Sequence, residues 1–460
     1  MKLDVKDIYE QIDKFMDKEI EISGWIKNHR KQKDFGFIDF SDGTHFKRMQ
    51  LIYDLDNPNF EEISKLKIGS AIKVFGKIIE SSGKNQDFEL KIDSVELLGD
   101  CPDDYPLQPK KHSLEFLREI AHLRPRSNTF QAINRIRSVS AHAVHEYFQS
   151  NGYIYAHTPF LTTADCEGSD QMFKVTTFDL AHVPIKEGEA DFSKDLFGQK
   201  TLLTGSGQLH GETMALAYKK IYTFGPTFRT ENSNTKTHAN EFWMIEPEVA
   251  FYDLDDLMDM EEDMLKFIVK YVMDHCPLEL EFCDKFIENG LLDKLNNLLK
   301  SEFKRIDHKE IVDILLASGK EWEFAPDYEG DIHKEHEKYI TDYYGGPVFI
   351  KNWPKDIKAY YMKQNADGKT VAAVDLVVPI AGELIGGSQR EEDYDKLYNR
   401  MKEMGLDPEQ IDWYLDLRKF GGCIHSGFGM GFDRLVMYLT GVENIRDTIP
   451  YPRTPKNCKY

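Results

Sequence analysis

The residues best suited to chemistry lie between positions 227 and 248. Arg229 and Glu231 belong to one strand-like run, Phe242 and Glu246 belong to a second, and a polar turn that contains His238 separates them. An arginine can pair with a phosphate group, and an aromatic ring can stack on a nucleotide base. This segment therefore predicts a nucleotide site.

Two further segments carry groups of the same kind. Residues 427–435 read GFGMGFDRL, so Gly429 and Gly431 precede Arg434, and glycine lets the backbone approach a nucleotide closely. Residues 382–392 read GELIGGSQREE and contain a carboxylate, Glu383, and a guanidinium, Arg390. An upstream stretch, 152–162, reads GYIYAHTPFLT and follows a helical pattern.

In chain order, 152–162, 227–248 and 427–435 resemble motifs 1, 2 and 3 of the class II aminoacyl-tRNA synthetases. Within that class the chain is most similar to the asparaginyl-tRNA synthetase family over essentially its whole length, with further matches at 161–168, 206–209 and 382–392. The resemblance implies a ligase that uses ATP to activate L-asparagine as asparaginyl-adenylate. It then transfers asparagine to the 3′ end of tRNA(Asn).

The resemblance also implies the residues that bind ATP. Arg229 and Arg434 would be the catalytic arginines, with Arg229 on the α-phosphate and the amino-acid carboxylate, and Phe242 and Arg434 on the two faces of adenine. The other ATP contacts are expected from Glu231, His238, Glu383, Gly429 and Gly431. One position departs from the family, because an arginine normally precedes the histidine and here Thr237 follows Lys236. Either Lys236 supplies the missing charge or the loop binds ATP less firmly.

Two carboxylates are expected to hold Mg²⁺ against the phosphates. Glu383 matches the family's metal-binding glutamate, and Asp375 lies on an adjoining extended stretch, with the capping of a turn as its alternative role. Carboxylate oxygens are the ligands that Mg²⁺ prefers in proteins. The sequence thus predicts ATP as a substrate and Mg²⁺ as the cofactor.

Four residues match the family's amino-acid pocket. Glu167 and Gln208 would hold the α-ammonium group, Arg390 would donate to the side-chain carbonyl, and Glu246 would accept the amide NH₂ and repel aspartate. Gly211 stands where the aspartyl enzymes carry a lysine, which disfavours a carboxylate substrate. The alternative for Glu246 is a strand carboxylate paired with a lysine.

The composition indicates a soluble globular protein, with 41% hydrophobic and 30% charged residues. The N-terminus lacks the apolar run of a secretory signal, and Asp375 and Glu383 interrupt the most apolar late stretch, so we expect a cytoplasmic protein without a membrane span. A net charge of −21 is unfavourable for a nucleic-acid partner, although a local basic track can exist on an acidic body.

The elements that must position these residues fall into two domains. Residues 1–100 show five strand-like runs with a helix-like piece at 60–66 after the third, which predicts an OB-fold β-barrel for anticodon binding. Residues 101–113 contain three prolines and predict a linker. Residues 114–460 predict an α+β catalytic domain on an antiparallel sheet, with a helical insertion at about 277–319 and strands at 348–351, 359–363 and 371–379.

The resemblance assigns roles outside the catalytic pocket as well. On the barrel, Arg30, Phe37 and Gln50 match the positions that bind the anticodon, with barrel core as the alternative for Phe37. Motif 1, with Pro159 after its long helix, forms a homodimer in this class.

Three other functions are compatible with much of this pattern. They are a non-discriminating aspartyl-tRNA synthetase, an adenylate-forming amidoligase that makes asparagine, and a tRNA-binding paralogue without catalysis. Gly211 argues against the first, the barrel residues Phe37 and Gln50 argue against the second, and intact Arg229, Glu383 and Arg434 argue against the third.

Overall fold

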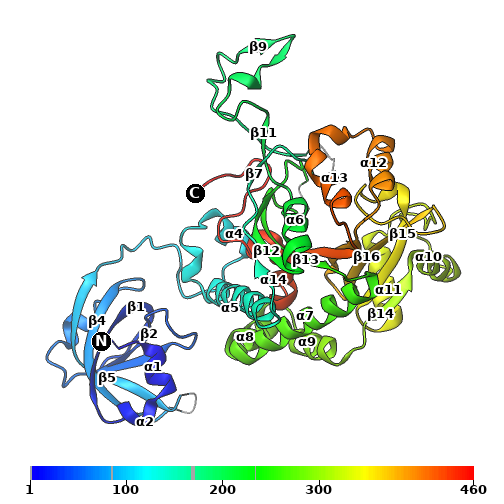
Figure 1. Ribbon diagram of the computed structural model, residues 1–460. Coiled ribbons are helices and arrows are strands. Elements are labelled where there is room, and N and C mark those ends of the chain that lie inside the picture. The colour runs from blue at the N-terminus through cyan, green and yellow to red at the C-terminus, as the bar shows by residue number, and fades with distance from the viewer. Residues whose placement is uncertain (1–2, 84–85, 167–170, 234) are drawn as a thin grey trace. The chain divides into compact units, whose positions relative to one another are not determined.

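The computed structural model describes residues 3–83, 86–166, 171–233 and 235–460. The chain separates into two compact units, of which the first ends at Ala132 and the second runs from Ile133 to Tyr460. Figure 1 shows the first as a small barrel and the second as a large mixed body. None of the helices in the described part of the chain is long and apolar enough to cross a membrane.

The first unit is a closed five-stranded barrel in the order β1-β2-β3-β5-β4. The strands are β1 Glu19–Lys31, β2 Phe35–Ser41, β3 Met49–Asp54, β4 Ala71–Glu80 and β5 Phe88–Gly99, and the short helix α3 Phe60–Ile63 follows β3. Alternate side chains fill the interior, among them Ile22, Ile38, Leu51, Val74 and Leu90. This alternation is the period-two pattern from which the barrel is predicted.

The second unit is built on an eight-stranded sheet in the order β14-β15-β16-β17-β18-β13-β12-β6. Its strands are β14 Lys304–Asp307, β15 Val348–Pro354, β16 Thr370–Val378, β17 Gly382–Gln389, β18 His425–Gly431, β13 Glu241–Ala250, β12 Lys220–Phe228 and β6 Ile154–Tyr155. All neighbours are antiparallel except the two outermost pairs, β14 with β15 and β12 with β6. The central strands β16, β17, β18 and β13 carry most of the candidate site.

Helices cover the sheet and fix its central strands. Helix α7, Leu254–His275, packs against β16, β17 and β18, and α14, Phe432–Thr440, packs against β13 and β18. The helix α6, Gln208–Tyr218, lies against β12 and β13, and the long helix α5, Asn128–Ser150, precedes β6. The apolar stripe of α7 is buried at Leu257, Met264 and Ile268.

Two expectations about elements are wrong in detail. The helical stretch 277–319 contains α8 Pro277–Phe286, α9 Leu291–Lys300 and α10 His308–Ala317, but β14 interrupts it and pairs with β15. The β14 sequence, KRID, has one apolar residue, so its pairing partner decides its conformation and not its own pattern. Residues 359–363 form no strand, only an isolated bridge at Met362.

The burial of two consecutive tyrosines explains why residues 359–363 do not form the expected strand. Consecutive Tyr360 and Tyr361 are both buried, which an alternating strand with one solvent face would not do. They join a cluster with Leu397, Met401 and Tyr414, from helices α12 Tyr394–Glu403 and α13 Asp412–Lys419. The apolar run therefore packs as a loop under two helices.

Candidate active site

A cavity of about 430 Å³ opens over the central strands of the second unit. It brings together every predicted small-molecule contact that the structure describes. These are Gln208, Arg229, Glu231, His238, Phe242, Glu246, Asp375, Glu383, Arg390, Gly429, Gly431 and Arg434. Glu167, the remaining one, lies outside the described residues.

The hairpin of β12 and β13 carries the side chains that are predicted to bind the nucleotide. Thr227 pairs with Phe242 across the two strands, which leaves Arg229 just beyond the end of β12. The Arg229 guanidinium lies 5.3 Å from the centre of the Phe242 ring. Asn240 ties the loop together, because its side-chain amide donates to the carbonyls of Arg229 and Glu231 at 2.8 and 2.9 Å.

His238 stands on the same loop with cations on several sides. Its Nε2 is 4.0 Å from Glu231, and its Nδ1 contacts the Thr235 hydroxyl at 2.5 Å. Burial, together with the charges of Arg434, Lys334 and Arg229, lowers the pKa of His238, and Glu231 opposes this. The free imidazole is therefore neutral near pH 7 and becomes easier to protonate when an anion occupies the cavity.

Arg434 lies in the first turn of α14, directly after β18. Its Nη1 donates to the backbone carbonyl of Glu383 at 3.3 Å. A Cβ on Gly429 would lie 2.7 Å from the terminal methyl carbon of Met244, which lines the same cavity. A side chain at position 429 would therefore push the flexible Met244 side chain aside.

Asp375 and Glu383 project from adjacent strands toward one point. Both flank Gly386, where a Cβ would lie 3.1 Å from a Glu383 oxygen and 3.5 Å from an Asp375 oxygen. Asp375 sits inside β16, so the turn-capping alternative is wrong. Its Oδ2 accepts from Lys358 Nζ at 2.7 Å. Burial and Glu383 raise the pKa of Asp375 to about 6, although Lys358 counteracts them.

The carboxylates of Asp375 and Glu383 suit a hard cation whose remaining ligands are phosphate oxygens. The described residues hold no cluster of three or more His, Cys, Asp or Glu side chains arranged around a metal ion. Mg²⁺ is commonly bound by one or two carboxylates together with water and substrate phosphates. Two carboxylates at the phosphate end of a nucleotide cavity fit that requirement.

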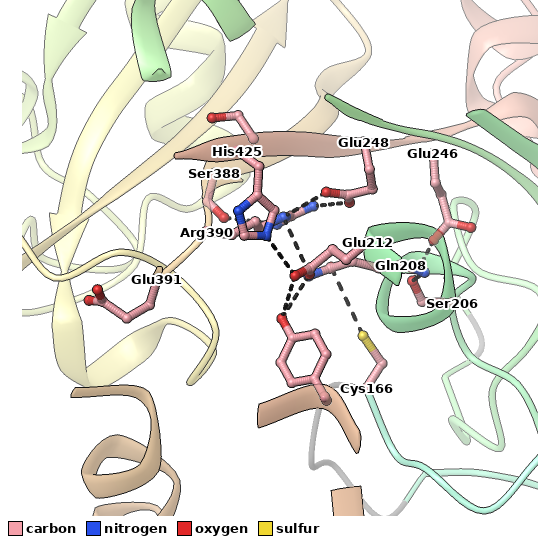
Figure 2. A network of polar contacts seen from close by, with 12 residues as sticks. Cys166, Ser206, Gln208, Glu212, Glu246, Glu248, Ser388, Arg390, Glu391 and His425 are labelled. Carbon is pink, nitrogen blue, oxygen red and sulfur yellow. Dashed lines mark hydrogen bonds and ion pairs between the residues drawn. The ribbon is translucent and has the colours of Figure 1, made fainter. Parts of the chain in front are cut away.

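The floor of the cavity is a buried polar network around Arg390 (Figure 2). The Arg390 guanidinium donates through Nε and Nη2 to the two oxygens of Glu248, and through Nη1 to the Ser388 hydroxyl at 2.8 Å. Burial lowers the pKa of Arg390, but Glu248 and Glu212 outweigh it and hold the pKa above its usual value. The guanidinium is therefore a fixed, charged donor.

Gln208 is oriented by the same network. Its side-chain NH₂ donates to Glu212 Oε1 at 3.0 Å. Glu212 is fully buried and also accepts from Tyr414, Arg418 and His425 at 2.7 to 2.9 Å. Because an ionised Glu212 only accepts, the amide of Gln208 must turn its oxygen the other way. That oxygen accepts from the thiol of Cys166 at 4.0 Å, and its second acceptor position can take an ammonium group, as the prediction for Gln208 requires.

Glu246 is buried and already satisfied in large part. Its Oε2 accepts from the backbone N–H of Gly207 and the hydroxyl of Thr223, both at 2.9 Å, and its Oε1 accepts from the hydroxyl of Ser206. A carboxylate has about four acceptor positions, so one is left for a ligand. No lysine among the described residues pairs with it, which makes the lysine-paired alternative wrong.

On the barrel, the three predicted anticodon residues form one outward group. Arg30 pairs with Phe37 across β1 and β2, its guanidinium lies 5.3 Å from the Phe37 ring, and its Nη2 donates to Gln50 at 2.9 Å. The neighbours Gly36 and Ile38 are buried, whereas Phe37 is half-buried and does not join the barrel core. The core-packing alternative for Phe37 is therefore wrong.

Sequence reasoning missed several residues that hold this site. Glu212, Glu248, Arg418 and His425 fix Arg390 and Gln208, and Lys358 pairs with Asp375. A signal existed for Glu248, which follows Glu246 at the two-residue spacing of one strand face. The partners from α13 and β18 come from distant segments, so no local pattern could reveal them.

Comparisons with known proteins agree with this geometry. A family model described as tRNA synthetases class II (D, K and N) matches residues 113–455, and one described as an OB-fold nucleic acid binding domain matches 20–98. The chain therefore belongs to the class II tRNA synthetases, and the predicted pairing of an α+β catalytic domain with an N-terminal OB-fold is confirmed.

Full-length relatives place the chain more narrowly. It is 53% identical to the asparagine–tRNA ligase of Acholeplasma laidlawii, with 100% of both chains covered, and 52% identical to that of Alkaliphilus metalliredigens, with 99% of both covered. The asparaginyl-tRNA synthetase of Pyrococcus horikoshii, solved with asparaginyl-adenylate, superposes with a TM-score of 0.87 at 29% identity, covering 100% of both chains. Within the class, the chain belongs to the asparagine–tRNA ligase family.

Proposed function

We propose that the cavity of the second unit carries out both steps of asparagine–tRNA ligation. The observation that carries the proposal is that one cavity gathers all of these groups. Phe242, Arg434 and Arg229 suit stacking and phosphate, Asp375 and Glu383 form a carboxylate pair, and Arg390 supplies a buried guanidinium. These groups match adenine, phosphates and an amide side chain.

In the first step, the asparagine carboxylate attacks the α-phosphorus of ATP and pyrophosphate leaves. Arg229 would neutralise both anions and stabilise the five-coordinate transition state, where charge develops. Phe242 and Arg434 would clamp adenine, which fixes the α-phosphate in line with the attacking oxygen. Mg²⁺ held by Asp375 and Glu383 would supply charge neutralisation at the phosphates.

Selection of asparagine would rest on two buried groups of opposite charge. Arg390 donates to the side-chain carbonyl, and the remaining acceptor position of Glu246 takes the amide NH₂. The side-chain oxygen of Gln208 would hold the α-ammonium, with Glu167 as its predicted partner. An aspartate would place a second carboxylate against Glu246, and that repulsion is strong where both groups are desolvated.

The test of this function is pyrophosphate exchange with the purified protein, comparing asparagine with aspartate. Exchange that depends on asparagine and is weak with aspartate is the expected result. Equal exchange with both amino acids would favour a non-discriminating aspartyl enzyme. No exchange with either would contradict the proposal.

In the second step, the terminal ribose hydroxyl of tRNA(Asn) would attack the adenylate carbonyl, and AMP would leave. The barrel would select the tRNA by stacking an anticodon base on Phe37, with Arg30 and Gln50 as hydrogen-bonding groups. Phe37→Ala should raise the KM for tRNA and leave tRNA-independent exchange unchanged. Equal loss of both activities would show that Phe37 acts through folding.

We also propose a homodimer through motif 1. The side chains of Ile154, Tyr155, Phe160 and Leu161 are 40 to 47% exposed, although all four are apolar or aromatic and follow one another closely. Exposed apolar patches of this kind often mark protein interfaces. Light scattering should give twice the chain mass, and Leu161→Asp should shift it toward one chain.

The domain limits and location follow the same reasoning. The barrel would span 1–100, the linker 101–113 and the catalytic domain 114–460, supported by the end of β5 at Gly99 and the start of α4, Leu114–Glu119. A cytoplasmic location is proposed because tRNA charging serves translation there.

A further inference from the structure

The motif 2 loop lacks a cation where its family normally has one, at Thr237. Lys236, the nearest candidate in sequence, does not fill the gap. Its ammonium donates to Glu443 at 2.6 Å, so its charge is already paired. Thr237 and His238 line the cavity.

A lysine from a distant segment reaches Thr237 instead. Lys334 Nζ donates to the Thr237 hydroxyl at 3.2 Å, across 97 residues of chain. Lys334 is the first residue of helix α11, Lys334–Tyr344. That helix is anchored beside the sheet by buried Ile340 and by His336, whose Nε2 contacts the carbonyl of Phe324 at 2.9 Å. The ammonium is thus brought to the loop by a fixed element.

Lys334 is also available to an anion. Among the described residues it forms an ion pair with no carboxylate, and its one recorded contact is the neutral Thr237 hydroxyl. Its charge acts on His238 together with those of Arg434 and Arg229. Glu231 and Glu383 line the same cavity, and the positive charge of Lys334 adds to those of Arg434 and Arg229 in attracting a polyanion to it.

We propose that Lys334 binds the β- or γ-phosphate of ATP, and the leaving pyrophosphate, in place of the arginine that Thr237 replaces. A lysine provides a flexible point charge and serves phosphate well even without the two-pronged geometry of arginine. In the free protein the ammonium is held by the hydroxyl of Thr237, a residue that lines the cavity. The inference rests on the proposed function only in naming ATP as the polyanion.

Lys334→Met, which keeps the length of the side chain and removes its charge, tests the inference. The KM for ATP and for pyrophosphate in the exchange assay should rise roughly tenfold, as for loss of one charged hydrogen bond that is partly exposed. The KM for asparagine should not change. The control is Lys338→Met, an exposed lysine one turn further along the same helix, which should behave as wild type.

A rescue variant separates phosphate binding from a structural role. Thr237→Arg combined with Lys334→Ser moves the cation back to the loop and should restore the ATP constants lost in Lys334→Met. Failure of this double variant to improve on Lys334→Met, or an unchanged KM for ATP in Lys334→Met, would overturn the inference.

Direct titration of ATP with Mg²⁺, without amino acid, keeps this result independent of the proposed function. A weaker ATP affinity in Lys334→Met, with wild-type affinity in Lys338→Met, supports the role of Lys334 whatever amino acid is activated. Equal affinity in both variants would contradict it. Absence of asparagine-dependent exchange in the wild type would contradict the proposed function alone.

Discussion

At the scale of single residues, the proposed selection of asparagine depends on how few acceptor positions Glu246 has left. Ser206, Gly207 and Thr223 donate to it, so its carboxylate is held in one orientation. In the proposal, this carboxylate beside the charged Arg390 distinguishes an amide from a carboxylate of nearly the same shape. Shape alone would discriminate poorly between these two substrates.

Glu246→Gln should therefore lower selectivity mainly by improving aspartate activation. The glutamine oxygen can keep the donors Gly207 and Thr223, and its NH₂ then takes the place of Oε1, where it can donate to the hydroxyl of Ser206 and to the carboxylate of a bound aspartate. The electrostatic part of the discrimination is a few kcal/mol in a partly buried pocket, on the order of a hundredfold. The ratio of kcat/KM for asparagine and aspartate in pyrophosphate exchange measures it.

Arg390→Ala is the matched comparison, because it should impair both substrates together. Full discrimination in Glu246→Gln would place the selective group elsewhere, with the backbone near Gly211 as the next candidate.

A second buried carboxylate, that of Glu261, affects the stability of the folded protein rather than the choice between asparagine and aspartate. Glu261 on α7 is fully buried, and neither of its oxygens has a hydrogen-bond partner among the described residues. Burial, with the charge of Asp375, raises the pKa of Glu261 well above its usual value. The folded protein therefore holds this proton more tightly than the unfolded chain does. The stabilisation that comes from this bound proton is complete below the pKa of Glu261 in the unfolded chain. It is lost as the pH rises toward the pKa of Glu261 in the folded protein.

Glu261→Gln should consequently raise the melting temperature more at pH 8 than at pH 5. A glutamine is neutral at every pH, so it removes a penalty of about 1.4 kcal/mol for each pH unit between the two pKa values of Glu261. Thermal unfolding of both proteins at the two pH values provides the measurement. A melting difference that is the same at pH 5 and pH 8 would show that Glu261 is ionised or hydrated in the folded protein.

At the scale of elements, the close approach of strands β18 and β13 fixes the asparagine end of the site. Gly427 and Glu248 are paired across these strands, and a Cβ on Gly427 would lie 2.3 Å from the Glu248 carboxylate. Glu248 in turn holds Arg390. The glycine of β18 thus leaves room for the carboxylate that orients the guanidinium.

Gly427→Ala should therefore displace Glu248 and, through it, Arg390. We expect the KM for asparagine to rise by about tenfold or more, because small displacements of positioning groups are costly. The KM for ATP should change much less, since neither Phe242 nor Arg229 contacts Glu248 or Arg390 among the described interactions. Pyrophosphate-exchange kinetics, with asparagine and ATP varied separately, would measure the two KM values. An equal rise in both would indicate general distortion of the sheet.

The same elements show what the sequence can and cannot predict. The barrel strands alternate clearly between buried and exposed side chains. Arg229, Phe242, Glu383 and Arg434 each lie within a short motif segment. Both the strands and these site residues could therefore be predicted from local patterns. Strand β14 has no such pattern and is defined by its partner β15. Lys334 and Glu212 act through residues far away in the chain, and such contacts exist only after folding.

At the scale of the whole molecule, a net charge of −21 must coexist with a tRNA partner. The barrel carries a local basic group, which consists of Lys27, Arg30 and Arg48. Arg30 and Arg48 share a single carboxylate, Asp39, at 3.5 and 3.9 Å. Burial, with the charges of Arg48 and Arg126, lowers the pKa of Lys27 to about 8. Cations that outnumber their carboxylates locally can bind phosphates on an otherwise acidic protein.

The two activities should therefore respond differently to salt. Each phosphate contact with RNA releases roughly 0.7 to 0.9 counterions, so one to three contacts predict a slope between about one and three when the logarithm of the KM for tRNA is plotted against that of the KCl concentration. Asparagine-dependent pyrophosphate exchange involves a pocket whose charges are mostly buried, and buried pairs are screened little. Its KM for asparagine should stay nearly constant between about 50 and 300 mM KCl. A tRNA constant that is equally insensitive to salt would mean that the basic group on the barrel makes no phosphate contact, and that stacking on Phe37 supplies the affinity.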